Sequence, residues 1–137
     1  MNPMKEGAKM DLVKIADWED IKYFSSKEFA CQHCGKDGIK IELVEKLDKL
    51  RELYRMPIKI TSGFRCPDHP LSVSRPTSSH LKGEAADIAA TSSRERYALL
   101  ELIFKHGLFK RIGIDGANKF IHVDIDEEKS QMLTWLY

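Results

Sequence analysis

The stretch FIHVDI, residues 120–125, alternates between apolar and polar side chains after its leading phenylalanine. Alternation with a period of two is typical of a β-strand that buries one face. We expect Ile121, Val123 and Ile125 to face the core, whereas Phe120, His122 and Asp124 share the opposite face. This stretch therefore predicts a sheet that packs on one side and carries titratable groups on the other.

The elements expected around this strand mix helices and strands without a regular alternation. Apolar residues at helical spacing predict helices over residues 42–55 and 92–106. The buried stripe of the second helix is expected to consist of Leu99, Leu100, Ile103 and Phe104. Ser92 and Glu95 have the spacing of a capping box for the second helix, and Gly107 suits its C-terminal cap. Short apolar or alternating stretches predict further strands at residues 58–61, 85–89 and 111–115.

Two segments have no clear strand pattern. Residues 62–79 are rich in Pro, Ser and Thr and are expected to form a long irregular loop, and residues 127–137 a short helix. The absence of a βαβ rhythm favours an α+β fold, a small and mostly antiparallel sheet flanked by helices.

Length and charge limit the classes of function. The 137 residues suit one domain, which we place at residues 24–137 after an N-terminal arm and short helix at residues 1–23. A net charge of +1 argues against a general electrostatic affinity for nucleic acid. No apolar run approaches the roughly 18 residues of a membrane span. The first residues lack the apolar core of a signal peptide, so synthesis in the cytoplasm is expected. A monomeric state is a separate expectation.

His80, Asp87 and His122 are the residues most suited to chemistry. Zinc binds imidazole nitrogen and carboxylate oxygen, and a catalytic site uses three protein ligands and one open position. His80 ends the long loop, and Asp87 lies in the next expected strand, so a short connection can bring both to one ion. The alternative is structural, because a histidine in a strand often only packs and an aspartate often only caps a turn.

Four motifs resemble those of the zinc D-alanyl-D-alanine carboxypeptidase family, peptidase family M15. Residues 29–35 (FACQHCG), followed by the helix expected at residues 42–55, are similar to the short cell-wall peptidases of this family. Residues 78–88 (SSHLKGEAADI) are similar to its S-x-H-x-x-G-x-A-x-D signature. Residues 60–69 (ITSGFRCPDH) resemble its S-G-x-R-x-P-x-H segment, and residues 120–124 resemble its final F-x-H-x-D strand. The family includes murein endopeptidases and phage endolysins and shares its fold with the hedgehog signalling domain. The resemblance covers about residues 24–126 and implies that fold here.

The resemblance also implies roles for individual residues. His80, Asp87 and His122 match the zinc ligands of the family. Arg65 matches an arginine that holds the carboxylate of the substrate or stabilises the developing oxyanion, and Ser78 matches a serine that lines the site. Without the motif, Arg65 would be interpreted as a surface ion pair.

The chain departs from the family pattern at the general base. Many relatives carry an acidic residue three positions before the last ligand, where this chain has Lys119. Asp124, on the same face as His122, is either the replacement base or a carboxylate that orients a ligand histidine. Asp115 and Glu84 are weaker candidates.

The loop after Arg65 also departs from the family. Where relatives usually carry His-Asn and a pair of glycines, this chain has His69-Pro70 and then Ser74-Arg75-Pro76. The loop is therefore expected to be stiffer and more basic, which bears on substrate specificity.

Cys31 and Cys34, with Cys66 further along, allow two interpretations. They can form a second, structural zinc site with His33 or His69, or they can be small buried thiols under a turn. The sequence favours the buried thiols, because a single CxxC is half of the usual ligand set. Trp18 and Trp135 are interpreted as packing residues.

Together these features imply a zinc metallopeptidase that hydrolyses amide bonds next to D-amino acids in peptidoglycan stem peptides, as a carboxypeptidase or an endopeptidase. Such a protein would act at the cell wall after release of the phage or prophage type. The alternative is a non-catalytic zinc-binding module that binds a peptide or protein, which Lys119 favours. A nucleic-acid-binding zinc knuckle would rest on Cys31 and Cys34 alone, and the charge balance opposes it.

Overall fold

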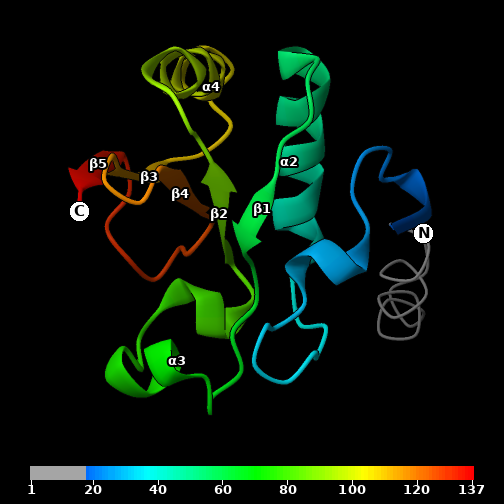
Figure 1. Cartoon of the computed structure of the whole chain (residues 1–137), viewed down its shortest axis with the longest axis vertical. Coiled ribbons are helices and arrows are strands. Elements are labelled where there is room, and N and C mark those ends of the chain that lie inside the picture. The colour runs from blue at the N-terminus through cyan, green and yellow to red at the C-terminus, as the bar shows by residue number, and fades with distance from the viewer. Residues whose placement is uncertain (1–17) are drawn as a thin grey trace, which may run out of the picture.

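The computed structural model describes residues 18–137, which form a five-stranded sheet and the helices packed against it (Figure 1). The strands follow the order β1-β2-β4-β3-β5. Their bounds are Ile60–Ser62 (β1), Ala85–Ala89 (β2), Arg111–Asp115 (β3), Phe120–Asp124 (β4) and Leu133–Leu136 (β5). Neighbouring strands pair antiparallel except β3 and β5, which are parallel. The expected α+β fold with a mostly antiparallel sheet is confirmed.

Two long helices lie where apolar spacing predicts them. They are α2 (Ile41–Tyr54) and α4 (Ser93–Lys105). The Ser92 hydroxyl accepts the backbone N–H of Glu95 at 3.1 Å, as expected of an N-cap. The Glu95 carboxylate, however, accepts the N–H of Thr91 rather than that of Ser92, so the reciprocal bond of the capping box is shifted by one residue.

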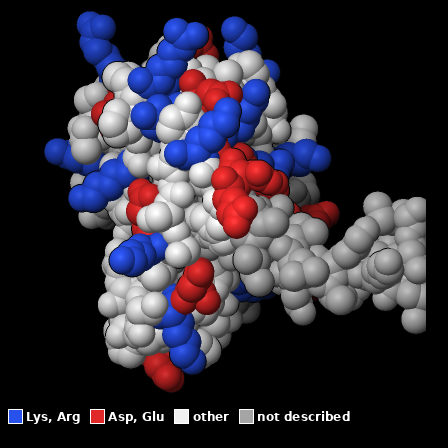
Figure 2. All heavy atoms as spheres, turned by 90° about the vertical axis from the view of Figure 1, so that its right-hand side faces the viewer, with Lys and Arg blue, Asp and Glu red and all other residues white. Residues whose placement is uncertain are grey.

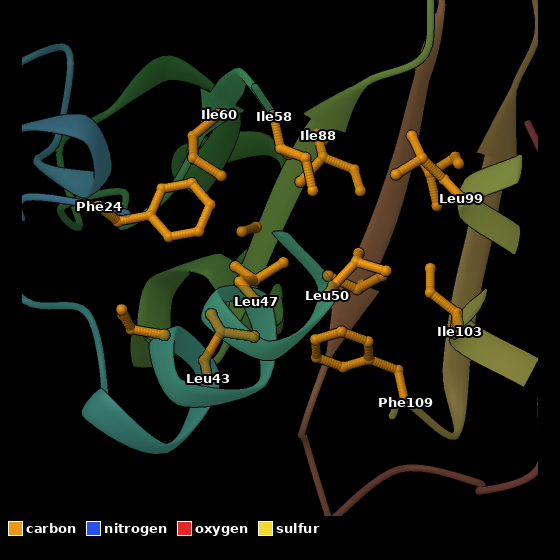
Figure 3. Packing of buried hydrophobic residues seen from close by; sticks show 14 of the residues in the cluster. Phe24, Leu43, Leu47, Leu50, Ile58, Ile60, Ile88, Leu99, Ile103 and Phe109 are labelled. Atoms are coloured by element: carbon orange, nitrogen blue, oxygen red, sulfur yellow. The ribbon is translucent and has the colours of Figure 1, made fainter. Parts of the chain in front are cut away.

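The hydrophobic core lies between these two helices and one face of the sheet (Figure 3). Leu43, Leu47 and Leu50 of α2 are fully buried, as are Ile121 and Val123 of β4. Leu99 and Ile103 of α4 complete the contact. The alternation predicted for β4 is confirmed, and it leaves the other face of the strand for polar side chains.

Three local expectations are wrong. The tail is not a helix, because it forms β5 beside the free edge of β3, where Tyr137 N–H donates to the Ile114 carbonyl at 3.1 Å. Residues 62–79 are not wholly irregular, since they contain α3 (Pro70–Ser74) and the start of the 3₁₀ helix η3 (Ser79–Lys82). Proline at the first position of α3 costs no hydrogen bond there. Phe104, expected in the buried stripe of α4, is 57% exposed.

Residues 1–17 lie outside the described part of the chain, and with them most of the expected N-terminal arm and short helix. From Trp18 onward the segment packs on the body of the protein through the 3₁₀ helix η2 (Ser26–Phe29), whose Phe29 is fully buried. None of the helices in residues 18–137 is long and apolar enough to span a bilayer. On the face that Figure 2 shows, basic and acidic side chains are interspersed.

Gly83 connects η3 to β2 at a point where two backbones come very close. Its φ is +72°, and a Cβ built on it would lie 1.9 Å from the carbonyl oxygen of Gly38. The Gly83 carbonyl in turn accepts the N–H of Lys40, just before α2. Any side chain at residue 83 would therefore push apart the segments that precede α2 and β2.

We expect Gly83→Ala to lower the free energy of unfolding by at least about 2 kcal/mol, because it adds backbone clash to left-handed strain. Gly107→Ala is the matched control, because Gly107 also has a positive φ (+59°) but a Cβ at that position would meet nothing within 4 Å. Urea unfolding of both variants measures the difference. Equal losses at the two positions would contradict a role for the close approach to Gly38.

Candidate active site

The polar face of the sheet places Asp87 of β2 directly opposite His122 of β4. Directly opposite residues have Cβ atoms roughly 4.5–5.5 Å apart, so the two side chains must meet. His80 approaches from η3, whose N-cap is Ser78 and which ends at the left-handed Gly83. The short η3 connection thus brings His80 to Asp87, and the sheet register adds His122, which lies 35 residues beyond Asp87 in the sequence.

The three side chains offer ligand atoms that lie within 4.8 Å of one another. His80 Nε2 is 3.3 Å and His122 Nδ1 is 3.0 Å from the same oxygen, Oδ1 of Asp87. All three residues are buried. Buried titratable groups this close together need either shared protons or a cation between them.

Hydrogen bonds on the far side of each ring decide which nitrogen faces Asp87. His80 Nδ1 lies 2.7 Å from the carbonyl oxygen of Gly63, and a carbonyl only accepts, so Nδ1 carries the proton. His122 Nε2 lies 2.7 Å from Oδ2 of Asp124. In the neutral rings, His80 Nε2 and His122 Nδ1 therefore direct lone pairs toward a carboxylate oxygen. Two imidazole lone pairs and one carboxylate form the donor set of a zinc site, so these residues fit that ion.

The electrostatics favour the neutral ring at His80 but the charged ring at His122, so a metal that binds there would displace a proton from His122. Burial lowers the pKa of His80, which favours the neutral form that binds metal. Burial also acts against charge on His122, but hydrogen bonds to Asp124 and Asp87 outweigh it and raise its pKa. For Asp87, burial alone would raise the pKa, yet the adjacent His122 and His80 rings, in their protonated forms, hold it well below the usual range. Asp87 is therefore a carboxylate at neutral pH.

A pocket of about 640 Å³ opens above these three residues. Its wall includes Arg65, Arg75 and Lys129 as cations and Trp135 and Tyr137 as aromatic rings. It is large enough to admit part of a peptide. The arrangement thus combines a candidate metal site with a cleft of basic and aromatic character.

A family model described as Peptidase M15 matches residues 22–124, about three quarters of the chain. The chain belongs to peptidase family M15. The resemblance noted in the motifs is thereby confirmed, and the domain is a peptidase domain by family. A search of the curated proteins gives no match.

In this M15 chain, Arg65 lies beside the candidate metal ligands. Its Nη2 is 3.4 Å from Oδ2 of Asp87, and its Nε donates to the Ser62 hydroxyl at 3.1 Å. Its guanidinium is largely buried rather than part of a surface ion pair. Ser78 lines the pocket, and its hydroxyl accepts the N–H of His80 at 3.2 Å.

The three acidic candidates for the base, and Lys119 at the position of the missing base, are placed very differently. Asp124 is completely enclosed and bonded to His122, while Arg111 Nε donates to its other oxygen at 2.8 Å. Asp115, at the end of β3, lies in the pocket wall and on the same face as His122. Lys119 is exposed in the turn between β3 and β4, and Glu84 pairs with Lys40 and is not part of the pocket wall.

Sequence patterns did not identify Trp135 and Tyr137 as residues of this site. The Trp135 ring packs 5.3 Å from the His122 ring, and Arg111 lies 5.0 Å from the same Trp135. Gly113 stands opposite His122, and a Cβ there would lie 2.6 Å from Trp135 Nε1. The signal was therefore present as a glycine inside an apolar strand, which often marks a close approach.

We expect Asp124→Asn to weaken metal binding by about 10- to 100-fold, because the carboxylate fixes the orientation of His122. Asparagine keeps the size of the side chain but offers one acceptor oxygen in place of two. Competition with a metal-sensitive chelator measures the change in affinity. Unchanged affinity together with lost turnover would instead assign Asp124 to proton transfer.

Proposed function

We propose that this M15 peptidase is a zinc-dependent metallopeptidase that hydrolyses amide bonds next to D-amino acids in peptidoglycan stem peptides. The observation that carries the proposal is the meeting of His80 Nε2, Asp87 Oδ1 and His122 Nδ1 at the base of the pocket. These three residues would hold the ion. A zinc ion held there would lower the pKa of water and polarise the scissile carbonyl.

The remaining residues of the site have separate tasks in this proposal. Arg65, held by Ser62 and Asp87, presents a guanidinium to the carboxylate or the developing oxyanion of the substrate. Asp124 keeps its oxygens on His122 and Arg111 and orients the ligand ring. Ser78 holds the start of η3, and so His80, in place.

Asp115 is the residue that we propose as the proton acceptor. The acidic residues of the pocket wall are Asp87, Asp115 and Asp124, and of these Asp115 alone is not bonded to a histidine of the site. Hydrogen bonds from the side chain and backbone of Asn118 lower its pKa, so it is ionised at neutral pH. A base at Asp115 would take the place of the acidic residue that many relatives carry at the position of Lys119.

The walls of the pocket favour a peptide that carries negative charge. Arg75 and Lys129 lie at the wall together with Arg65 and can bind carboxylates, which stem peptides carry at their free ends. The aromatic rings of Trp135 and Tyr137 offer flat surfaces for apolar groups. The basic loop expected from residues 69–76 therefore contributes Arg75 to the candidate substrate site.

The direct test is the full chain with defined muropeptides, before and after removal of metal by a chelator. We expect cleavage next to a D-amino acid, its loss in the metal-free protein and its recovery with zinc. The same peptides with L-amino acids at the scissile position are the control. Cleavage that persists without metal, or that is equally fast with D- and L-amino acids at the scissile position, would overturn the proposal.

A non-catalytic zinc-binding module remains the second candidate, because Lys119 stands where relatives have an acidic base. It predicts binding of one zinc ion at His80, Asp87 and His122 but no turnover of any stem peptide.

For localisation we propose action at the cell wall after release from the cytoplasm. Lysis of bacteria by the protein added from outside would support it, and failure on exposed peptidoglycan would contradict it.

We expect Arg65→Ala to lower kcat/KM by about 10²- to 10³-fold while the metal content is retained. The way in which the loss divides between kcat and KM distinguishes two roles of Arg65. Loss of a contact with the ground-state carboxylate raises KM, whereas loss of oxyanion stabilisation lowers kcat. Arg65→Lys is the matched control, since it keeps the charge without the planar fork of donors. Steady-state kinetics on a muropeptide measure both parameters. Wild-type kinetics in Arg65→Ala would exclude Arg65 from the reaction.

A further inference from the structure

The three cysteines of the chain meet in a second cluster. Cys31 and Cys34 lie in the turn after η2, and Cys66 follows Arg65. Their Sγ atoms lie within 4.8 Å of one another, and all three thiols are free. Contrary to the expectation of buried thiols, Cys34 is exposed, whereas Cys31 and Cys66 are buried. Cys66 thus adds a third thiol to the pair that the CxxC spacing of Cys31 and Cys34 supplies.

The backbone around Cys31 is arranged to stabilise a thiolate. The N–H of Cys66 donates to Cys31 Sγ at 3.2 Å. The turn closes when the N–H of Gly35 donates to the Cys31 carbonyl at 2.7 Å, which requires the positive φ of Gly35 (+77°).

His33 supplies a nitrogen beside the thiols. Its Nδ1 is 3.6 Å from Cys66 Sγ. Ligands at zinc distances of about 2.3 Å for sulfur and 2.0–2.1 Å for nitrogen lie roughly 3.5–3.6 Å apart on a tetrahedron. The observed separation from Cys66 equals that of two ligands on one ion, while the group of ligand atoms within 4.8 Å of one another comprises the three thiols alone, so the exposed His33 ring would move closer to Cys31 and Cys34 to complete the site. The other histidine nearby, His69, uses its Nδ1 to accept the N–H of Leu71 at the start of α3.

We propose that Cys31, Cys34, Cys66 and His33 form a closed structural zinc site, separate from the site at His80. Three thiolates and one imidazole are a common set for structural zinc, which leaves no open position for substrate. An exposed Cys34 and His33 at the rim give the ion a path of entry, while Cys31 and Cys66 anchor it inside.

The position of the cluster indicates what such an ion would do. It joins the turn of residues 31–36 to Cys66, the neighbour of Arg65 in the chain. The residues just before each of them are also paired, because Phe64 N–H donates to the carbonyl of Phe29 at the end of η2 at 2.8 Å. The ion would thus fix the backbone that carries Arg65 to the N-terminal part of the domain.

Metal content of the full chain, reduced and purified with zinc, gives the first test. We expect the wild-type protein to bind one zinc ion more than Cys34→Ser, and His122→Ala to lose its own ion but keep the ion of the cysteines. Cys34→Ser is chosen because the exposed thiol is not part of the core. Failure of the proposed peptidase activity would leave this result unaffected, because the readout is metal bound at other residues.

Cobalt(II) distinguishes the two sites by spectrum. Only a thiolate ligand produces an intense sulfur-to-cobalt charge-transfer band in the near ultraviolet, and the site at His80 holds no sulfur. We expect the band in wild-type protein and in His122→Ala but not in Cys34→Ser. A spectrum without this band in the reduced wild-type protein, or a band that survives in Cys34→Ser, would overturn the proposal.

His33→Ala tests the fourth ligand. We expect it to weaken zinc binding at the thiols by about tenfold or more, as measured by competition with a chelator. His69→Ala, at the neighbouring ring 6.1 Å away, is the control and should leave the affinity unchanged. The reverse result would overturn the assignment of His33.

Discussion

Replacing His122 with alanine is expected to abolish hydrolysis, with a loss in kcat/KM on the order of 10⁴-fold or more. The ring is buried between Asp87, Asp124 and Trp135, and its Nδ1 faces the same oxygen as His80 Nε2. Without this ligand, two ligands remain, which is fewer than catalytic zinc sites use. Metal analysis of the variant and turnover of a muropeptide measure the two losses together.

The control for this variant has to separate loss of a ligand from loss of folding. His106→Ala removes an exposed histidine at the end of α4 and should keep metal and activity. Circular dichroism and thermal unfolding of the metal-free proteins show whether His122→Ala keeps its fold. A folded His122→Ala that still binds zinc at the His80 site would contradict the ligand assignment.

The helices and the central strands could be predicted because each has a local cause. The apolar period of α2, the Ser92 cap of α4 and the alternation of β4 are properties of neighbouring residues. The tail was misinterpreted because β5 depends on pairing with β3, more than 20 residues earlier along the chain. Its side chains are mostly exposed, so no local apolar pattern distinguishes a strand from a helix.

The candidate site, like the fold, could be predicted from the sequence only in part. The types of His80, Asp87 and His122 indicate metal chemistry, but their meeting depends on the register of β2 against β4, which spacing does not determine. The two interpretations of Asp124 could not be separated by sequence, because both place it on the face of His122. Its hydrogen bonds to His122 and Arg111 favour orientation of the ligand, which is the role that we propose.

Asp115→Asn is expected to lower kcat by about 10²- to 10⁴-fold while zinc affinity stays close to that of the wild type. The Asp115 side chain lies in the pocket wall and is bonded to Asn118, not to a candidate ligand. Asparagine keeps an acceptor for the Asn118 N–H but cannot accept a proton from water at neutral pH. Turnover and zinc competition on the same preparation measure the two quantities.

The comparison with Asp124→Asn gives this prediction its control, because both substitutions remove one carboxylate from the same face of the sheet. If Asp115 accepts the proton, its variant loses the acidic limb of the pH profile of kcat/KM, and the Asp124 variant keeps that limb once zinc is saturating. A carboxylate that only supports the turn would affect stability and leave the limb in place. The acidic limb reports the group that must be ionised for the reaction. If Asp115→Asn keeps this limb and Asp124→Asn loses it, Asp124 is the proton acceptor and the role proposed for Asp115 is wrong.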